Sequence, residues 1–271
     1  MTPGPRELFV THAASEKAQR GRIFIIILIA VGLAMLLSRQ PMLGALPGSA
    51  WALCVLLGAF ALSWWSGISA RAHAMLRLGR IRREGLVATQ KLNAGDVAGA
   101  REAFAALLFI DRSLGAFHAV HVLMYGVTRF FEGEAKEGLA LASRAIDSGW
   151  LDQKHTRSVR DAAETWRVLM LLAAGELAEA RRRVDGASKD ALLTAAIAVS
   201  AHEGMWAAVL AEADRALADP QFPKSGRPSI AAMALFAAKK QGMSGAPYRK
   251  ILEVEKPGPL TLQNPALRKF L

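Results

Sequence analysis

Two apolar segments near the N-terminus, residues 23–38 and 50–70, constrain the folding of this 271-residue chain more than any other feature. No charged residue lies between Arg39 and Arg71, and the second segment has about the 20 residues with which an α-helix crosses roughly 30 Å of hydrocarbon. Only a short loop separates the two segments. The sequence therefore predicts a transmembrane helical hairpin over residues 23–70.

The first apolar segment is short for a membrane span. It has 16 residues between Arg22 and Arg39, or about 24 Å of helix at the usual rise per residue. Arginines that extend toward the interface, or a locally thinner bilayer, would make up the difference. A cleaved signal peptide is the alternative, but no small-x-small cleavage site directly follows Leu37. We therefore expect a retained hairpin preceded by an N-terminal segment, residues 1–22.

Positive charge is concentrated on both sides of the predicted hairpin. Residues 1–83 contain ten Lys or Arg against two acidic residues, which is +8 of the net +11, and the connecting loop has only Arg39. Because positively charged flanks stay in the cytoplasm, both termini are predicted to lie there, as in a multi-pass protein of a bacterial-type inner membrane. The surplus charge is explained by topology and by contact with anionic lipid, so nucleic-acid binding is not expected.

The part of the chain after Arg71 is predicted to be a helical domain. It has 200 residues, enough for a core, and its abundance of Ala, Leu and Arg favours helix. Its first helix is expected to continue from the second apolar segment. A domain of five antiparallel helix pairs is predicted over residues 71–256, and an irregular tail follows over residues 257–271. The predicted helices cover residues 77–94, 97–110, 115–132, 135–147, 157–174, 177–186, 189–203, 206–218, 228–241 and 245–254.

A repeat emerges when the turns between paired helices are aligned at their glycines. Gly95 is followed, five, nine and twelve residues later, by Ala100, Phe104 and Leu107. A glycine in the left-handed conformation ends one helix, an acidic residue favours the start of the next, and a small residue one turn later lets two helices touch. We expect Gly242 to start a fifth unit. Small or apolar residues recur at the same offsets after Gly133, Gly175 and Gly204.

The segment from Leu92 to Asp96, Leu-Asn-Ala-Gly-Asp, followed by Ala100 and Phe104, resembles the tetratricopeptide repeat (TPR) family. The resemblance covers residues 80–245. It implies an all-α fold in which a TPR-like α-solenoid of four to five helix pairs follows the membrane hairpin, with a concave surface for a protein or peptide partner. The turn glycines are spaced by 38, 42, 29 and 38 residues rather than evenly, which predicts shortened helices around residues 187–201.

The TPR resemblance implies a scaffold or adaptor rather than an enzyme. The expected function is to bind a protein partner or to assist the assembly of a membrane complex, with the hairpin raising the local concentration of the partner. The layout of a two-helix anchor, a basic flank and a repeat domain also resembles the HemY-type proteins associated with haem synthesis. That resemblance implies the alternative of a membrane enzyme or an enzyme-accessory protein.

Candidate partner-contacting residues lie on the first helices of the second and third pairs. Two adjacent phenylalanines cannot share one face of a helix, so one of Phe130 and Phe131 is expected to face the inner surface or the neighbouring repeat. On the first helix of the third pair, Arg157, Arg160 and Arg167 would form a basic stripe for an acidic peptide. Core packing and a solvated charged face are the alternatives. The candidates are Leu123, Val127, Arg129, Phe130, Phe131, Arg160 and Arg167.

Residue patterns for catalysis and cofactor binding are weak. The single cysteine, Cys54, lies in the second apolar segment, so neither an internal disulfide nor a cysteine metal site is expected. His118 and His121 could reach one ion, but no third ligand follows at a helical offset. No nucleophile turn and no P-loop is present in the sequence. We expect no cofactor. The apolar residues of the C-terminal tail suggest the further hypothesis that the tail occupies the domain's own groove.

Overall fold

A computed structural model describes residues 25, 28–31, 33–36, 48–110, 115–152, 156–187 and 192–270. The described chain contains helices and turns and no β-strand, which confirms the all-α class. It divides into two compact units, and the division falls inside one long helix, between Arg83 and Glu84.

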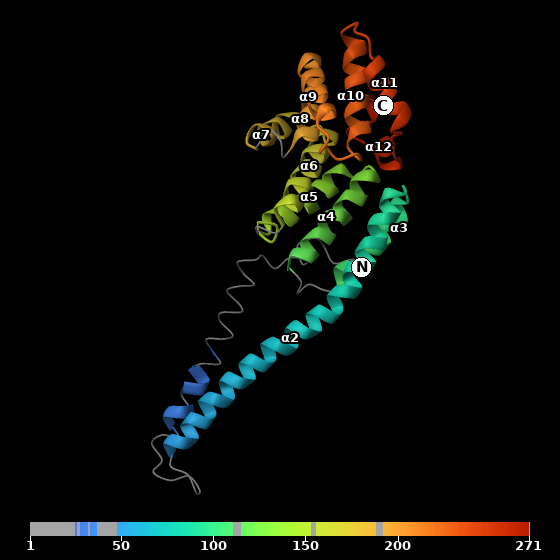
Figure 1. The fold of residues 1–271 in the computed structure, drawn as a ribbon. Coiled ribbons are helices and arrows are strands. Elements are labelled where there is room, and N and C mark those ends of the chain that lie inside the picture. Colours follow the sequence, from blue (N-terminus) through green and yellow to red (C-terminus); the bar gives the residue numbers. More distant parts are fainter. Residues whose placement is uncertain are drawn as a thin grey trace. The chain divides into compact units, whose positions relative to one another are not determined.

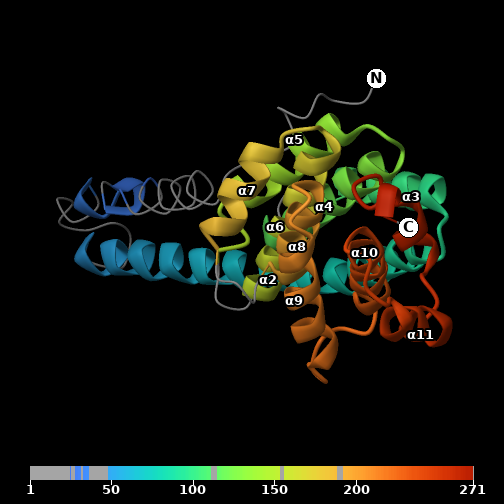
Figure 2. The ribbon, with the colours of Figure 1, turned by 90° about the horizontal axis from the view of Figure 1, so that it is seen from above.

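The long helix is α2, Gly48–Asn93 (Figure 1). It is continuous, so the second apolar segment runs without a break into the helix predicted at residues 77–94. Figures 1 and 2 show the described parts of residues 25–36 beside the first turns of α2. No helix in the described part of the chain combines the length and the apolar character of a membrane span. Residues 1–22, the connecting loop and much of the segment 23–38 lie outside the described residues, and the transmembrane hairpin stays a prediction.

The part of the chain from Glu84 onward, called the second unit below, is a succession of helix pairs. First helices of successive pairs contact one another, α4 with α6, α6 with α8 and α8 with α10, as in a helical repeat. From α3 to α11, the predicted ranges agree with the observed ones to within four residues at each end. The helices are α3 (Val97–Ile110), α4 (Gly115–Phe131), α5 (Ala135–Asp147), α6 (Arg157–Ala173), α7 (Leu177–Asp185), α8 (Leu193–His202), α9 (Trp206–Ala218), α10 (Arg227–Lys240) and α11 (Ala246–Val254).

The five predicted turn glycines all adopt the left-handed conformation. Their φ angles lie between 68° at Gly242 and 93° at Gly133. At the first turn the Gly95 amide donates to the Leu92 carbonyl at 2.9 Å, and the Asp96 amide donates to the Lys91 carbonyl at 3.0 Å. The other four turns repeat this pair of bonds, which satisfies the last carbonyls of each helix. The glycine spacing therefore marks the helix ends correctly.

The acidic residues after these glycines have a smaller role than expected. Asp96 caps α3, because its Oδ1 accepts a hydrogen bond of 2.9 Å from the Gly99 amide. Glu134 and Glu176 occupy the same position before α5 and α7, but neither side chain bonds to the helix start. Their favourable interaction with the helix is limited to their charge near its N-terminus.

The residues at the repeat offsets form the contacts between helices. Ala100, Phe104 and Leu107 are at most 2% exposed. The pattern weakens after the third turn, where α7 has 9 residues and α8 has 10, as the short glycine spacing predicts. The pattern of buried residues at these offsets is lost after the fifth turn, because Val254, twelve residues after Gly242, is 76% exposed.

The predicted irregular tail contains helical turns. A short helix, α12 (Pro259–Gln263), and a 3-10 turn over Arg268–Phe270 form there. Proline at the start of α12 favours this outcome, because its fixed φ fits the first helical position and its missing N–H has no partner there to lose.

We expect Gly138→Ala to lower the unfolding free energy by roughly 1–3 kcal/mol, as overpacking does. A Cβ at Gly138 would lie 2.7 Å from the Gly126 carbonyl oxygen, where α5 touches α4. This clash outweighs the roughly 1 kcal/mol by which alanine favours a helix. Thermal unfolding of the full chain by circular dichroism measures the change. Gly186→Ala is the control, since its nearest contact would be an ordinary 3.4 Å; equal losses in both variants would contradict the close-packing argument.

Candidate functional site

The apolar candidates on α4 lie in the core. Leu123, Val127 and Phe130 are at most 2% exposed, so these side chains have almost no surface for a partner to contact. Phe130 packs with its ring centroid 6.2 Å from that of Trp166 on α6. Their burial therefore supports the alternative that these three side chains pack in the core.

Phe131 reaches the neighbouring repeat and keeps part of its surface. Its ring meets that of Trp166 edge-on, with centroids 5.7 Å apart, and also contacts Phe130 at 5.3 Å. Phe131 and Trp166 are both half-buried. The three rings join α4 to α6, and the partly exposed edge of Phe131 and Trp166 is what this cluster offers to a partner.

The candidate arginines are paired with acidic residues. Arg129 donates to Glu137 on α5, with its Nε at 3.0 Å and a terminal nitrogen at 2.8 Å, and it also pairs with Glu132. The hydrogen bonds to Glu137 raise the pKa of Arg129 above its ordinary value. Arg160 pairs with Asp152 in the loop before α6. Because each guanidinium already has carboxylate partners, these residues do not form an open basic stripe.

Arg167 is the most deeply placed of the predicted residues, at 2% exposed. It donates to Asp147 at 2.8 Å and to the Ser143 carbonyl at 3.1 Å, so it ties α6 to α5. A terminal nitrogen also lies 3.5 Å from Glu164. Its Nε has no hydrogen-bond partner among the described residues. These contacts keep the buried charge paired, which a charge removed from water requires.

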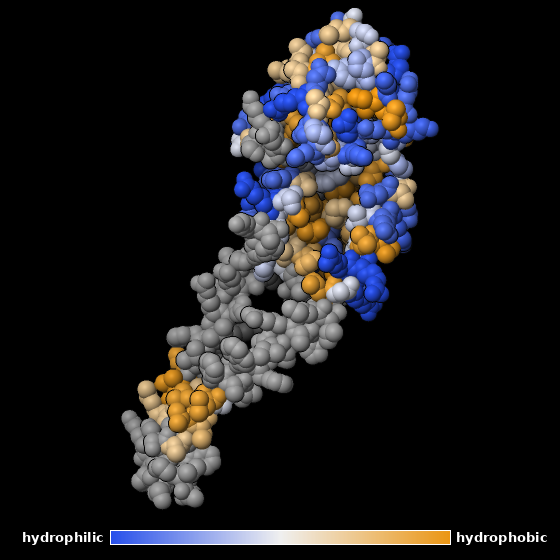
Figure 3. Space-filling model, viewed as in Figure 1, coloured by the Kyte–Doolittle hydropathy of each residue, from blue (hydrophilic) through white to orange (hydrophobic). Residues whose placement is uncertain are grey.

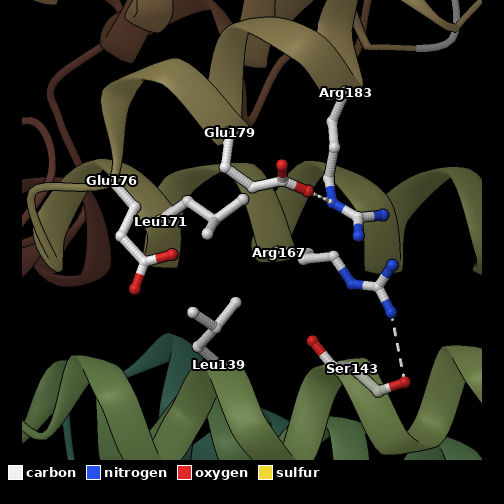
Figure 4. A pocket seen from close by; sticks show the side chains of 7 residues that line it. All are labelled: Leu139, Ser143, Arg167, Leu171, Glu176, Glu179 and Arg183. Carbon is white, nitrogen blue, oxygen red and sulfur yellow. Dashed lines mark hydrogen bonds and ion pairs between the residues drawn. The ribbon is translucent and has the colours of Figure 1, made fainter.

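A cleft of about 370 Å³ opens beside Arg167, between α5, α6 and α7 (Figure 4). Leu139 and Leu171 form its apolar part, and Glu179 pairs with Arg183 on one side of it. The charges in this cleft balance one another, so it offers a small apolar surface without a free cation. The lining residues are Leu139, Ser143, Arg167, Leu171, Glu176, Glu179 and Arg183.

A second cleft, of about 380 Å³, lies between α8, α10 and the C-terminal tail. Its walls are aromatic: Phe236 lies 5.5 Å from Trp206 and 5.3 Å from Phe270, between ring centroids. Lys240 lies over the ring of Phe236 at 5.4 Å, and Lys269 over that of Phe270 at 4.8 Å. This cleft was not predicted from the sequence, because no local pattern indicates that the last residues of the chain reach α8 and α10.

His202 is the polar centre of the second cleft. Its Nε2 lies 2.8 Å from the Ala266 carbonyl oxygen, and its Nδ1 lies 3.1 Å from the Lys269 Nζ. A neutral ring satisfies both contacts, with Nε2 donating and Nδ1 accepting. Burial lowers the pKa of His202 from its ordinary value, and Lys269 acts in the same direction, while the bond to Ala266 opposes them. The neutral form is thus the one that holds the tail.

No family model, curated protein or solved structure matches this chain. The succession of helix pairs is compatible with a helical repeat, and membership of the TPR family stays an expectation from the sequence.

His118 and His121 are both buried on α4, at 4% and 7% exposed. Burial, and the neighbouring His118, lower the pKa of His121 to about 4. Its ring lies against α2, where a Cβ on Gly85 would come within 2.9 Å of Nε2. In the described residues no three His, Cys, Asp or Glu side chains gather into a possible metal site.

Proposed function

We propose that this protein is a membrane-anchored scaffold whose TPR-like helix pairs bind a protein partner at the cytoplasmic face. The observation that carries the proposal is the stacking of α4, α6, α8 and α10, each closed by a left-handed glycine turn. Such stacks give a continuous surface built from several helices, the form in which helical repeats bind extended partners. Tethering that surface would raise the effective concentration of the partner at the membrane.

Exposed apolar side chains support the membrane anchor. On the early part of α2, Leu53 is 58% and Leu57 is 60% exposed, and on the first segment Leu28 is 59% exposed. Figure 3 shows the described side chains of this part of the chain, up to residue 58, as a cluster of hydrophobic colour. Apolar patches of this kind mark surfaces that something else covers, and a bilayer covers them in the proposed hairpin.

The proposed contact with the partner is the exposed edge of the aromatic cluster formed by Phe131 and Trp166. Aromatic side chains in partly formed pockets dominate the energy of many protein interfaces. Arg129 comes two residues before Phe131 on α4, and Arg160 comes six residues before Trp166 on α6. Because both are paired with carboxylates, we assign them to the polar rim of the interface rather than to its centre.

In-cell crosslinking of a tagged full-length chain, followed by membrane purification and mass spectrometry, tests the scaffold proposal. We expect one defined protein partner, and Phe131→Ser should reduce its recovery by about tenfold or more, as loss of an interface anchor does. Phe117→Ser is the matched control, because Phe117 is on the same helix and is 39% exposed. A chain lacking residues 1–70 should lose the partner from the membrane fraction. Equal recovery with Phe131→Ser would exclude that contact site, and recovery of only a small molecule would favour the enzyme-accessory alternative.

Labelling of the single cysteine, Cys54, tests the proposed membrane anchor in the wild-type sequence. Cys54 is exposed in the described structure and lies within the proposed second span. In sealed membrane vesicles we expect a membrane-impermeant maleimide not to label Cys54, because thiolates do not form in hydrocarbon and the reagent does not enter it. Labelling should become complete after denaturation in detergent, as measured by intact mass. Rapid labelling in intact vesicles would exclude a span over residues 50–70.

A further inference from the structure

The C-terminal tail, residues 257–270, folds back along the helix pairs. Ala266, Leu267 and Phe270 are at most 5% exposed, although they follow the last helix pair. In Figures 1 and 2 the C-terminal end lies beside α10, on the side of the helix pairs where α3 also lies. The tail is therefore packed as tightly as the core over its last residues.

The contacts of the tail span distant parts of the sequence. Pro259 lies so close to the first turn that a Cβ on Gly95 would come within 2.8 Å of it. Thr261 lies 3.3 Å from the Ser229 hydroxyl on α10, and Ala266 accepts the bond from His202 on α8. The tail thus connects the first helix pair with the fourth and the fifth.

The contacts of the tail are of the kind that a bound peptide makes: inserted apolar side chains and a hydrogen bond to the backbone. Two apolar side chains, Leu267 and Phe270, insert among the helices, and Phe270 stacks edge-on against both His202 and Phe236 at 5.3 Å. Its main polar anchor is a backbone carbonyl, which any sequence can supply. α12 has only 5 residues, so the tail adds no further helix pair to the stack.

We infer that the partner-binding surface includes, besides the edge of Phe131 and Trp166, the surface beneath residues 257–270, and that the tail is the built-in occupant of this second part. The inference rests on the proposed scaffold function. The partner is a protein segment with the chemistry of the tail: an apolar side chain and, three residues later, an aromatic side chain for the cleft between Trp206, Phe236 and His202. The tail competes with it at the high effective concentration of a short tether, so the partner binds only where it displaces the tail.

The test uses a fluorescent peptide of residues 257–271 and the full-length chain in detergent micelles. Leu267→Asp combined with Phe270→Asp should release the chain's own tail, and we expect the peptide to bind this variant at least about tenfold more tightly than the wild type. A peptide with Phe270→Ala should not bind. Recovery of the crosslinked partner should also rise in the released variant.

A locked variant, whose tail is fixed to α10 by a disulfide, separates tail release from any effect on folding, because the same chain is compared before and after reduction. Ser229→Cys with Thr261→Cys, in a Cys54→Ser background, places two thiols where the hydroxyls are 3.3 Å apart. The oxidised chain should bind neither peptide nor partner, and reduction should restore the wild-type values.

Each contrary result points to a different error. Equal peptide affinities for the wild-type and released chains would overturn the inference, while partner recovery by the wild type would leave the scaffold proposal intact. Unchanged partner recovery in the released and locked variants would assign the partner to another surface. A wild-type dimer that dissociates in the released variant, seen by light scattering, would make a second copy's tail the occupant. Failure of every variant to capture a protein would remove the scaffold proposal itself.

Discussion

Phe130→Ala should destabilise the second unit strongly, by about 3–5 kcal/mol, because it removes a large side chain from a packed core. Phe130 is 0% exposed, and its ring contacts both Phe131 and Trp166. A cavity there would loosen the junction of α4 with α6. Urea unfolding of the full-length chain in micelles, followed by circular dichroism, measures the loss.

Phe131→Ala is the matched comparison for this substitution. It removes the same number of atoms from the next position, but Phe131 is only half-buried. We expect a loss of less than about 2 kcal/mol, made up of a partial transfer term and one aromatic contact. Equal losses at the two positions would mean that Phe131 also belongs to the core, and Phe131→Ser would then no longer be a clean test of partner binding.

The burial of Phe130 and Phe131 could be predicted only in part from the sequence. Their adjacency places the two rings on different faces of α4, and that much follows from helix geometry alone. Which ring is buried depends on Trp166, 35 positions further on, and on the way α6 packs against α4. A pattern within one helix carries no information about the position of the next helix.

Features whose hydrogen bonds join neighbouring residues could be predicted from the sequence. The turn at Gly95 was predictable because a left-handed residue after a helix favours glycine, and its two closing hydrogen bonds involve neighbouring residues only. The arginines were not predictable in the same way. The carboxylate beside Arg167 belongs to Asp147, 20 positions earlier on another helix, so the pair depends on the tertiary fold.

The tail gives the clearest case of a contact without a local signal. Its apolar composition predicted that it would dock, but not that Pro259 would reach the turn at Gly95 or that Ala266 would bond to His202. These contacts bridge 164 and 64 positions of sequence. They depend on how successive helix pairs stack, and in a repeat the position of a distant pair sums the arrangements of all the pairs between.

Mild acid should destabilise the second unit through His121, whose pKa is lowered to about 4 from an ordinary value of 6.5. Between these two values the unfolded chain binds a proton that the folded chain does not, so the unfolding free energy falls as the pH is lowered. The full effect of such a shift is roughly 3 kcal/mol, reached near pH 4. The cause is burial of the ring against α2 and Phe104, whose ring centroid lies 6.3 Å away, and the charge of His118 adds to it.

His121→Gln separates this effect from the other acid-sensitive groups, because glutamine keeps a polar side chain of similar length and does not titrate. We expect its unfolding free energy to change much less between pH 6.5 and pH 4 than that of the wild type, as measured by urea unfolding across that range. The lowered pKa of His202 acts in the same direction, so His202→Gln should remove a further part of the slope and combine additively with His121→Gln. The lowered pKa of Glu203, paired with Arg181, matters only at lower pH, where carboxylates titrate. A wild-type slope that persists in the double variant would show that neither histidine is kept neutral by the fold, and that the acid sensitivity comes from the ion pairs between helices.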